Sequence, residues 1–227
     1  MKALLYKEFK LAMHPICYVF IALFPFMILI PSYPLAIGFI YVLTCYPILF
    51  LGANKGQQSN DLLFSTLLPV RKKDIVLARI ITVIAMQLAF MAIMSALCPL
   101  AIYLQSNIID ETTGLQLDVS VGLNLNAFVL TLAVAIIGFA VADLIFFPIY
   151  YKKGRSIVGS TLFTILGFVV YLSVFTIALP YIIGVDLVNS LALWIQFIAL
   201  GVAILISAAL HFVVYKVASK KLERVDF

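Results

Sequence analysis

The chain has 227 residues, of which 65% are apolar and only 11% are charged, and its mean hydropathy is +1.18. Soluble domains have about 45–50% apolar and about 25% charged residues, so a water-soluble globule could not bury this much apolar surface. Disordered chains are excluded too, because they combine low hydrophobicity with high charge. The composition predicts one all-α polytopic membrane domain, residues 1–227, without a large soluble catalytic domain.

Residues 1–15 are expected to form an interfacial helix ahead of the first span. Its apolar residues would share one face: Leu4, Leu5, Phe9 and Ala12. Lys7 and Lys10 would lie on the opposite face, and the alternative is a simple cytoplasmic lead-in to the span. A cleaved signal peptide is not expected, because residues 32–36 show no small-x-small cleavage pattern and the apolar stretch continues beyond them.

Charge-free gaps predict the membrane spans. Residues 11–54 contain no Lys, Arg, Asp or Glu, and this stretch is too long for one crossing but suits two. The break falls at Pro31-Ser32-Tyr33-Pro34, because prolines remove backbone donors and disfavour helix. We expect six transmembrane helices, near residues 16–31, 35–54, 75–104, 125–150, 157–183 and 191–215. The first is short and contains Pro25, so we expect a kink there.

All 15 Lys and Arg residues can be placed on one side of the membrane. They are Lys2, Lys7, Lys10, Lys55, Arg71, Lys72, Lys73, Arg79, Lys152, Lys153, Arg155, Lys216, Lys220, Lys221 and Arg224. The positive-inside rule then places both termini in the cytoplasm of a bacterial cell. The same rule accounts for the net charge of +5, so membrane lipids are expected as partners and nucleic acid is not.

The longest cytoplasmic connection, residues 56–74, is expected to contain a short helix. Ser59 or Asn60 can cap this helix and Pro69 ends it. Its apolar residues form one stripe: Leu63, Phe64, Leu67 and Leu68. Asp74 is expected to cap the third span. Because a helix of about ten residues is marginal alone, it should dock on the protein's own helix ends or on another protein.

Motifs for catalysis and metal binding are absent from the sequence. His14 and His211 are the only histidines, and we interpret both as interfacial residues. There is no HExxH, no Gly-x-Ser-x-Gly and no phosphate-binding GxxxxGK[ST]. The three cysteines lie in apolar runs, so neither a disulfide framework nor a zinc motif is expected. We expect no enzyme activity, no catalytic residue and no cofactor or metal site in this chain.

Asp143 is the one carboxylate inside an apolar run. It lies about 13 Å along a helix from Lys152, and an ionised Asp at the centre of a span costs about 2.5–3.5 kcal/mol on insertion scales. Asp143 is therefore either a functional group in a wet path or a structural cap. In the structural case it would hydrogen-bond a neighbouring helix or pair with Arg79 or Arg155.

Other intramembrane residues are expected to make contacts between helices. Gln87 and Gln196 are polar groups inside predicted spans, and interhelical hydrogen bonds explain them most simply. Two small-residue pairs, Gly138-x-x-x-Ala142 and Ala203-x-x-x-Ser207, would allow helices to approach closely.

Residues 62–79, LLFSTLLPVRKKDIVLAR, resemble the segment before the third span of type 2 ATP-binding-cassette (ABC) permeases. In that family a leucine-rich helix leads to Leu-Pro-(Val/Ile)-(Ser/Arg)-Arg/Lys and then to a helix that begins Ile-Val. The opening MKALLYKEFKL resembles the family's N-terminal interfacial helix, and the six-span arrangement agrees over the whole chain. The chain is similar to small permeases of bacterial peptide exporters such as the phenol-soluble modulin exporter.

The resemblance implies a half-transporter. Two permeases, copies or paralogues, would form a dimer, and separate ABC ATPase subunits would bind ATP and Mg. A cytoplasmic coupling helix between spans 2 and 3 would contact the ATPase, and the candidate contact residues are Leu63, Phe64, Leu67, Pro69, Arg71 and Lys72, with Lys153 and Arg155 as a second contact. The implied function is export of amphipathic peptides, lipids or drugs. The alternative is an ATP-independent secondary carrier or channel that uses Asp143.

Overall fold

The computed structural model describes residues 2–13, 15–29, 70–104, 125–153 and 157–224. Within these ranges the secondary structure is helical, without strands. The N-terminal elements are α1 (Lys2–Lys7), the π-helix η1 (Glu8–Ala12), α2 (Pro15–Leu23) and the 3-10 helix η2 (Phe24–Leu29). They are followed by α6 (Lys72–Leu104), η4 (Leu125–Ala127), α8 (Phe128–Lys153), α9 (Ile157–Leu172), the π-helix η5 (Ser173–Ala178), α10 (Leu179–Ile183), α11 (Val185–Asn189) and α12 (Leu193–Glu223).

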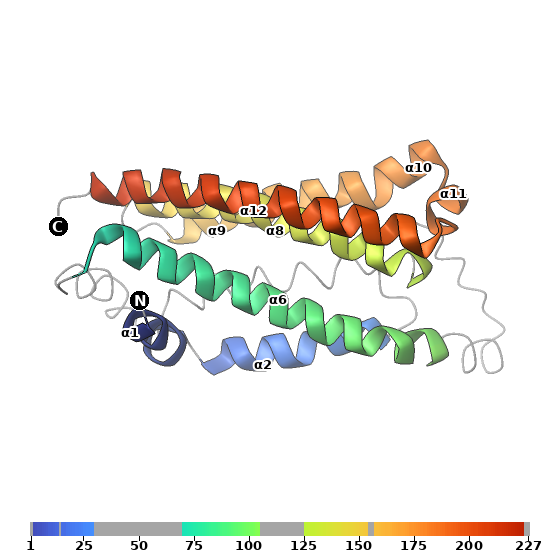
Figure 1. The fold of residues 1–227 in the computed structure, drawn as a ribbon, viewed down its shortest axis with the longest axis horizontal. Helices are drawn as coiled ribbons and strands as arrows, with labels where there is room; N and C mark the ends of the chain where they lie inside the picture. The colour runs from blue at the N-terminus through green and yellow to red at the C-terminus, as the bar shows by residue number, and fades with distance from the viewer. Residues whose placement is uncertain (1, 14, 30–69, 105–124, 154–156, 225–227) are drawn as a thin grey trace.

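Four helical stretches in the described part of the chain are long and apolar enough to cross a membrane: Lys72–Leu104, Leu125–Lys152, Val158–Ile183 and Leu193–Glu223. They run along the long axis of the molecule (Figure 1) and cover the regions expected for the third to sixth spans. The stretch α12 has 31 residues, which is about 46 Å of helix, whereas the hydrocarbon layer is about 30 Å thick. The ends of this helix therefore extend beyond the hydrocarbon.

The helix α6 begins earlier than the sequence suggested. Asp74 was expected as its N-cap, but α6 already starts at Lys72, and the Asp74 amide donates to the Arg71 carbonyl at 2.9 Å. Asp74 thus lies in the first turn of the helix, so the prediction of its cap position was wrong. A carboxylate in the first turn still interacts favourably with the positive end of the helix dipole.

The N-terminal helices form a bent pair. The segments Lys2–Lys10 and Pro15–Leu29 meet at 77°, and α2 and η2 lie along α6 (Figure 1). The helix changes from α to 3-10 around Pro25, because proline has no N–H to donate to the preceding turn. Pro15–Leu29 occupies the region of the first expected span, whereas the second expected span, residues 35–54, lies outside the described residues. The count of six spans therefore stays a prediction.

The helix α8 lies at the centre of the bundle and packs mainly against α12 and α9. Gly138 permits the close approach to α9, because a Cβ atom at this position would lie only 2.8 Å from the Phe168 ring and 2.9 Å from the Tyr171 ring. Next to it, Phe139 stacks on Phe168 with 5.4 Å between ring centroids. Ala142 is fully buried, so this small-residue pair does lie at a helix interface.

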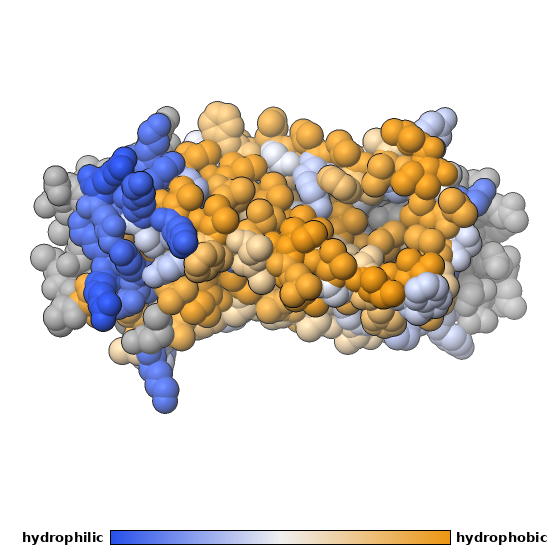
Figure 2. Space-filling model, turned by 45° about the horizontal axis from the view of Figure 1, so that its top comes forward, coloured by the Kyte–Doolittle hydropathy of each residue, from blue (hydrophilic) through white to orange (hydrophobic). Residues whose placement is uncertain are grey.

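The surface is apolar along the middle of the bundle and polar at one end (Figure 2). This end, called the basic end below, contains the start of α6 and the ends of α8 and α12. Two contacts join these helices there. Lys73 Nζ lies 3.3 Å from Glu223 Oε1, and Lys221 Nζ donates to the Pro148 carbonyl at 3.3 Å. The basic residues of these three helices therefore lie on the same side of the bundle.

Candidate functional site

The structure describes only part of the expected ATPase contact. Arg71 is exposed just before α6, and Lys72 is the half-buried first residue of that helix. Lys153 is the last residue of α8, and its side chain is not described. The other candidate residues lie outside the described ranges: Leu63, Phe64, Leu67, Pro69 and Arg155. The expected coupling segment runs directly into α6, so a displacement of the segment would act on this helix first.

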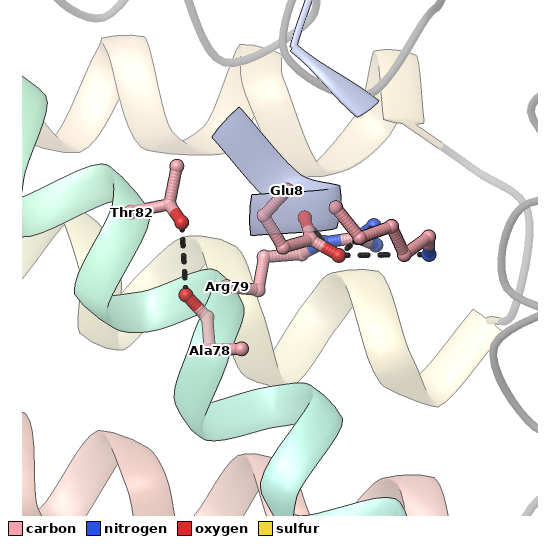
Figure 3. A network of polar contacts seen from close by, with 5 residues as sticks. Glu8, Ala78, Arg79 and Thr82 are labelled. Carbon is pink, nitrogen blue, oxygen red and sulfur yellow. Dashed lines mark hydrogen bonds and ion pairs between the residues drawn. The ribbon is translucent and has the colours of Figure 1, made fainter. Parts of the chain in front are cut away.

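Two turns into α6, Arg79 forms a buried ion pair with Glu8 of η1 (Figure 3). Arg79 Nε donates to Glu8 Oε2 at 3.0 Å and Arg79 Nη2 donates to Glu8 Oε1 at 3.3 Å. The two side chains are only 4% and 5% exposed. Paired bonds between a guanidinium and a carboxylate fix the orientation as well as the distance. The Arg79–Glu8 layer, as we call it, thus joins the N-terminal helix rigidly to α6.

The N-terminal helix is oriented differently from the expectation. Lys7 was expected on an exposed polar face, but Lys7 and Glu8 are both buried. The Lys7 ammonium lies 3.7 Å from Glu8 Oε1, on the side that faces Arg79. The prediction was wrong for Lys7, because α6 offers a cation on the inner face that attracts the neighbouring Glu8 carboxylate. Leu4 is buried and Lys10 is exposed, as expected. The π-helical geometry of η1 also shifts the residues that follow out of the 3.6-residue period.

Aromatic side chains of α8 surround this layer. The Tyr151 hydroxyl is buried and lies near Arg79 and Glu8. Phe146, Phe147 and Tyr150 are buried too, and stacked and edge-to-face ring contacts connect them with one another and with Tyr151. The aromatic groups limit the access of water to the ion pair, which strengthens the attraction between its charges.

A second polar layer lies deeper in the bundle and involves α6, α8 and α12. Asp143 of α8 is fully buried, and its Oδ2 atom lies 3.0 Å from His211 Nε2 of α12. Gln87 Nε2 of α6 donates to the same oxygen at 3.4 Å. The second ring nitrogen of the histidine, Nδ1, lies 2.8 Å from the Ser207 carbonyl oxygen. We call this group the Asp143–His211 layer, and it connects three of the long helices.

The structural interpretation of Asp143 included hydrogen bonds to a neighbouring helix, and the structure has such bonds to α6 and α12. Arg79 pairs with Glu8, Arg155 lies outside the described residues, and the carboxylate bonds to Gln87 and His211 instead. Sequence reasoning had set His211 aside as an interfacial residue. The sequence contains no clear signal for the pairing, because Asp143 precedes its first basic residue, Lys152, by nine positions, whereas His211 precedes Lys216 by five.

Gln196 lies near the opposite end of the bundle from these layers. Its Nε2 atom donates to the carbonyls of Asn126 at 3.2 Å and Leu191 at 2.9 Å. The first of these bonds connects α12 with η4, so Gln196, like Gln87, does contribute a hydrogen bond between separate helical segments. It belongs to neither polar layer and has a structural role.

Neither layer is a metal site. Among the described residues, no group of three or more His, Cys, Asp or Glu side chains could hold a metal ion. Cys17 and Cys98 are buried and form no disulfide with each other. The chemistry available in the described bundle is therefore that of an ion pair at the basic end and of proton sharing between a carboxylate and an imidazole.

Comparison with known proteins gives one match. A family model described as ABC-2 family transporter protein matches residues 3–218. The matched region includes both polar layers and nearly all of α12. Searches of curated proteins and of solved structures found no match.

Proposed function

The chain belongs to the ABC-2 family of transporter proteins and is therefore a multi-pass membrane component of an ABC transporter, and we propose that it is the permease subunit of an ATP-driven exporter. The observation that carries the proposal is the family match over residues 3–218, together with four helices suited to crossing a membrane. Permeases of this family typically work with ABC ATPase subunits. We propose such a subunit as the source of ATP hydrolysis here.

We propose six spans, with both termini in the cytoplasm of a bacterial cell. The positive-inside rule supports this orientation, since the basic residues at the start of α6 and the end of α12 lie at one end of the bundle (Figure 2). Cysteines placed near Thr113 and Asp186 should then react with an impermeant reagent on intact cells. Labelling near Gln58 from outside would contradict this topology.

The coupling route proposed here has two parts. Residues 59–73 would receive the motion of the ATPase, and α6, which begins at Lys72, would carry it into the membrane. The Arg79–Glu8 layer supports this route, because it joins α6 to the N-terminal helix through a buried bidentate contact. Displacement of α6 would thus move the N-terminal helix with it.

The proposed substrates are amphipathic peptides, lipids or drugs, and the proposed assembly is a dimer of permeases. Large apolar side chains cover the outer surfaces of α9, α10 and α12, for example Leu166, Tyr181 and Leu205. Such a surface suits lipid and a second permease alike, and it suits substrates that partition into the membrane. The resemblance to peptide exporters supports amphipathic peptides first.

The ATP-independent carrier that uses Asp143 is less well supported. A proton path across the membrane needs a series of ionisable groups. Between the Asp143–His211 layer and the far ends of the helices, the described parts of α6, α8, α9 and α12 contain no Asp, Glu, His, Lys or Arg. Within the described parts of these helices, a proton path from Asp143 toward the opposite side of the membrane would therefore have no further carboxylate, histidine, lysine or arginine.

The first experiment isolates the chain from native membranes and identifies the proteins that accompany it. We expect an ATPase with a Walker motif, and we expect inside-out vesicles that contain both chains to accumulate an amphipathic peptide only when ATP is supplied. Accumulation by the permease alone, driven by an ion gradient without ATP, would refute the proposal.

The second experiment tests the coupling segment with the double change Phe64→Ser and Leu67→Ser. If an ATPase groove buries these side chains, each is worth about 1.5–3 kcal/mol, so the double change should weaken association by about a hundred- to ten-thousandfold. The matched control is Arg71→Gln, which should have a smaller effect because exposed ion pairs are worth under about 1 kcal/mol. Unchanged copurification and substrate-stimulated ATPase activity would show that the contact lies elsewhere, first at residues 150–156.

A further inference from the structure

The contacts of His211 in the Asp143–His211 layer indicate which of its ring nitrogens carries a hydrogen. His211 Nδ1 lies 2.8 Å from the Ser207 carbonyl oxygen, and a carbonyl oxygen can only accept. The Ser207 hydroxyl lies farther from the same nitrogen, at 3.2 Å, and can accept as well as donate. The shorter contact with the carbonyl oxygen assigns a hydrogen to Nδ1. In a neutral imidazole the other nitrogen, Nε2, then has a lone pair and no hydrogen.

This tautomer fixes the number of protons in the contact with Asp143. His211 Nε2 and Asp143 Oδ2 are 3.0 Å apart, and two lone pairs at this distance would repel. One proton must lie between the two atoms. It belongs either to an imidazolium that faces a carboxylate or to a neutral carboxylic acid that faces a neutral imidazole. The pair has no net charge in either form, which suits a buried position between helices.

Other polar groups of the described helices α6, α9 and α12 make contacts of their own. Gln87 of α6 is neutral and donates to the same oxygen. On α9, the Thr164 hydroxyl donates to the Ser160 carbonyl and the Tyr171 hydroxyl donates to the Val134 carbonyl. The Lys216 ammonium of α12 lies 4.5 Å from the Phe212 ring centroid. Nearer the basic end, Arg79 and Lys7 both lie within ion-pair distance of Glu8, and Arg79 precedes Gln87 by about 12 Å along α6.

We propose that Asp143 and His211 form an intramembrane site that binds one proton, and that the bound proton holds α12 against α8. Removal of the proton leaves a buried carboxylate opposite the lone pair of Nε2, and both repulsion and desolvation then favour separation of the helices. The sign follows from the proton count: the contact is formed when the proton is bound and weakens as the pH rises. Adding a second proton at low pH would leave a buried cation, which is also unfavourable.

The first test reads the proton directly. The chain has two histidines, so the His14→Gln variant labelled with nitrogen-15 histidine gives the NMR signals of His211 alone. In lipid nanodiscs near neutral pH, Nδ1 should be protonated. In addition, either Nε2 should be protonated or infrared spectra should show a carboxylic acid band that disappears in Asp143→Asn. A neutral imidazole together with an ionised Asp143 would overturn the proposal.

The second test uses Asp143→Asn, which keeps the contact but not the proton. The asparagine amide can donate to Nε2 of a neutral His211, and the Gln87 side chain, which contacts the same atom of residue 143, must turn so that its carbonyl oxygen accepts the second hydrogen of that amide. The thermal midpoint of the wild-type chain in nanodiscs should fall by roughly 5 °C between about pH 6 and about pH 9. In Asp143→Asn this dependence should be absent, whereas in the exposed control Glu223→Gln it should persist. A pH dependence that persists unchanged in Asp143→Asn would refute the site.

Discussion

Each of the two polar layers of the bundle contains a buried carboxylate, but the layers balance its charge in different ways. The Arg79–Glu8 layer pairs a carboxylate with a guanidinium, which stays charged at any pH that proteins tolerate. The Asp143–His211 layer pairs a carboxylate with an imidazole, so both partners can become neutral. The first layer lies near the basic end, and the second lies deeper among apolar side chains. The permanent pair thus lies nearer the basic end, and the neutralisable pair lies farther into the apolar part of the bundle, where an ionised group is most costly.

The spacing of the layers follows from the antiparallel packing of α6 and α8. Arg79 precedes Gln87 by eight residues on α6, and Asp143 precedes Tyr151 by eight residues on α8, which is about 12 Å in each case. Each helix therefore contributes one residue to each layer. A displacement of α6 acts on η1 through one layer and on α8 and α12 through the other.

The largest effect is expected from Glu8→Ala. This change leaves a buried guanidinium that cannot lose its charge, and breaking a buried ion pair costs about 3–5 kcal/mol. Reversible unfolding in mixed micelles, followed by circular dichroism, measures the loss. Combining Glu8→Leu with Arg79→Met should recover most of the stability, because the charge is then removed as well. A loss below about 1 kcal/mol for Glu8→Ala would mean that lipid phosphate replaces the carboxylate.

A smaller effect is expected from His211→Phe. Asp143 also loses a charged partner here, but it can take up its own proton and become neutral. The cost should then be that of an unsatisfied buried polar group, about 1–3 kcal/mol. The same unfolding measurement applies, and His211→Gln is the control that can still hydrogen-bond. A loss of unfolding free energy as large as that of Glu8→Ala would show that Asp143 stays ionised. The two layers would then not differ in whether their charge can be neutralised.

Gln87→Leu should cost less again. Its bond to Asp143 is long, at 3.4 Å, and an ordinary hydrogen bond contributes about 0.5–1.5 kcal/mol. In a double-mutant cycle with Asp143→Asn, the coupling energy should be smaller than that between Asp143 and His211. A larger coupling to Gln87 would mean that α6, and not α12, is the main partner of the carboxylate.

The smallest effect is expected from Glu223→Gln at the basic end. Its ion pair with Lys73 is 3.3 Å long, but the side chains are 45% and 52% exposed. Exposed pairs contribute under about 1 kcal/mol, and salt screens them. Unfolding at low and at about 1 M salt should give nearly equal stabilities for the variant, whereas the wild type should lose its small advantage as the salt rises. A loss above about 2 kcal/mol would show that burial does not separate strong pairs from weak ones here.

The sequence by itself determined the properties that depend on composition and on neighbouring residues. Hydropathy and the positions of Lys and Arg are local features, and they were enough to predict a helical membrane protein and to find the regions of α6, α8, α9 and α12. Asp143 and Gln87 could be singled out for the same reason, because a polar residue in an apolar run is visible without a partner. The element at residues 62–79 indicated the family, which the match over residues 3–218 confirms.

The tertiary structure alone decided which polar residues meet. Glu8 and Arg79 are 71 positions apart, and Asp143 and His211 are 68 positions apart. In a soluble protein an apolar stripe marks the buried face of each helix, but lipid is as apolar as the bundle interior. The faces of α8 and α12 are therefore apolar all round, and their sequences do not show how the helices are rotated. Packing sets that rotation, through contacts such as Gly138 against Phe168, and the rotation brings His211 to Asp143.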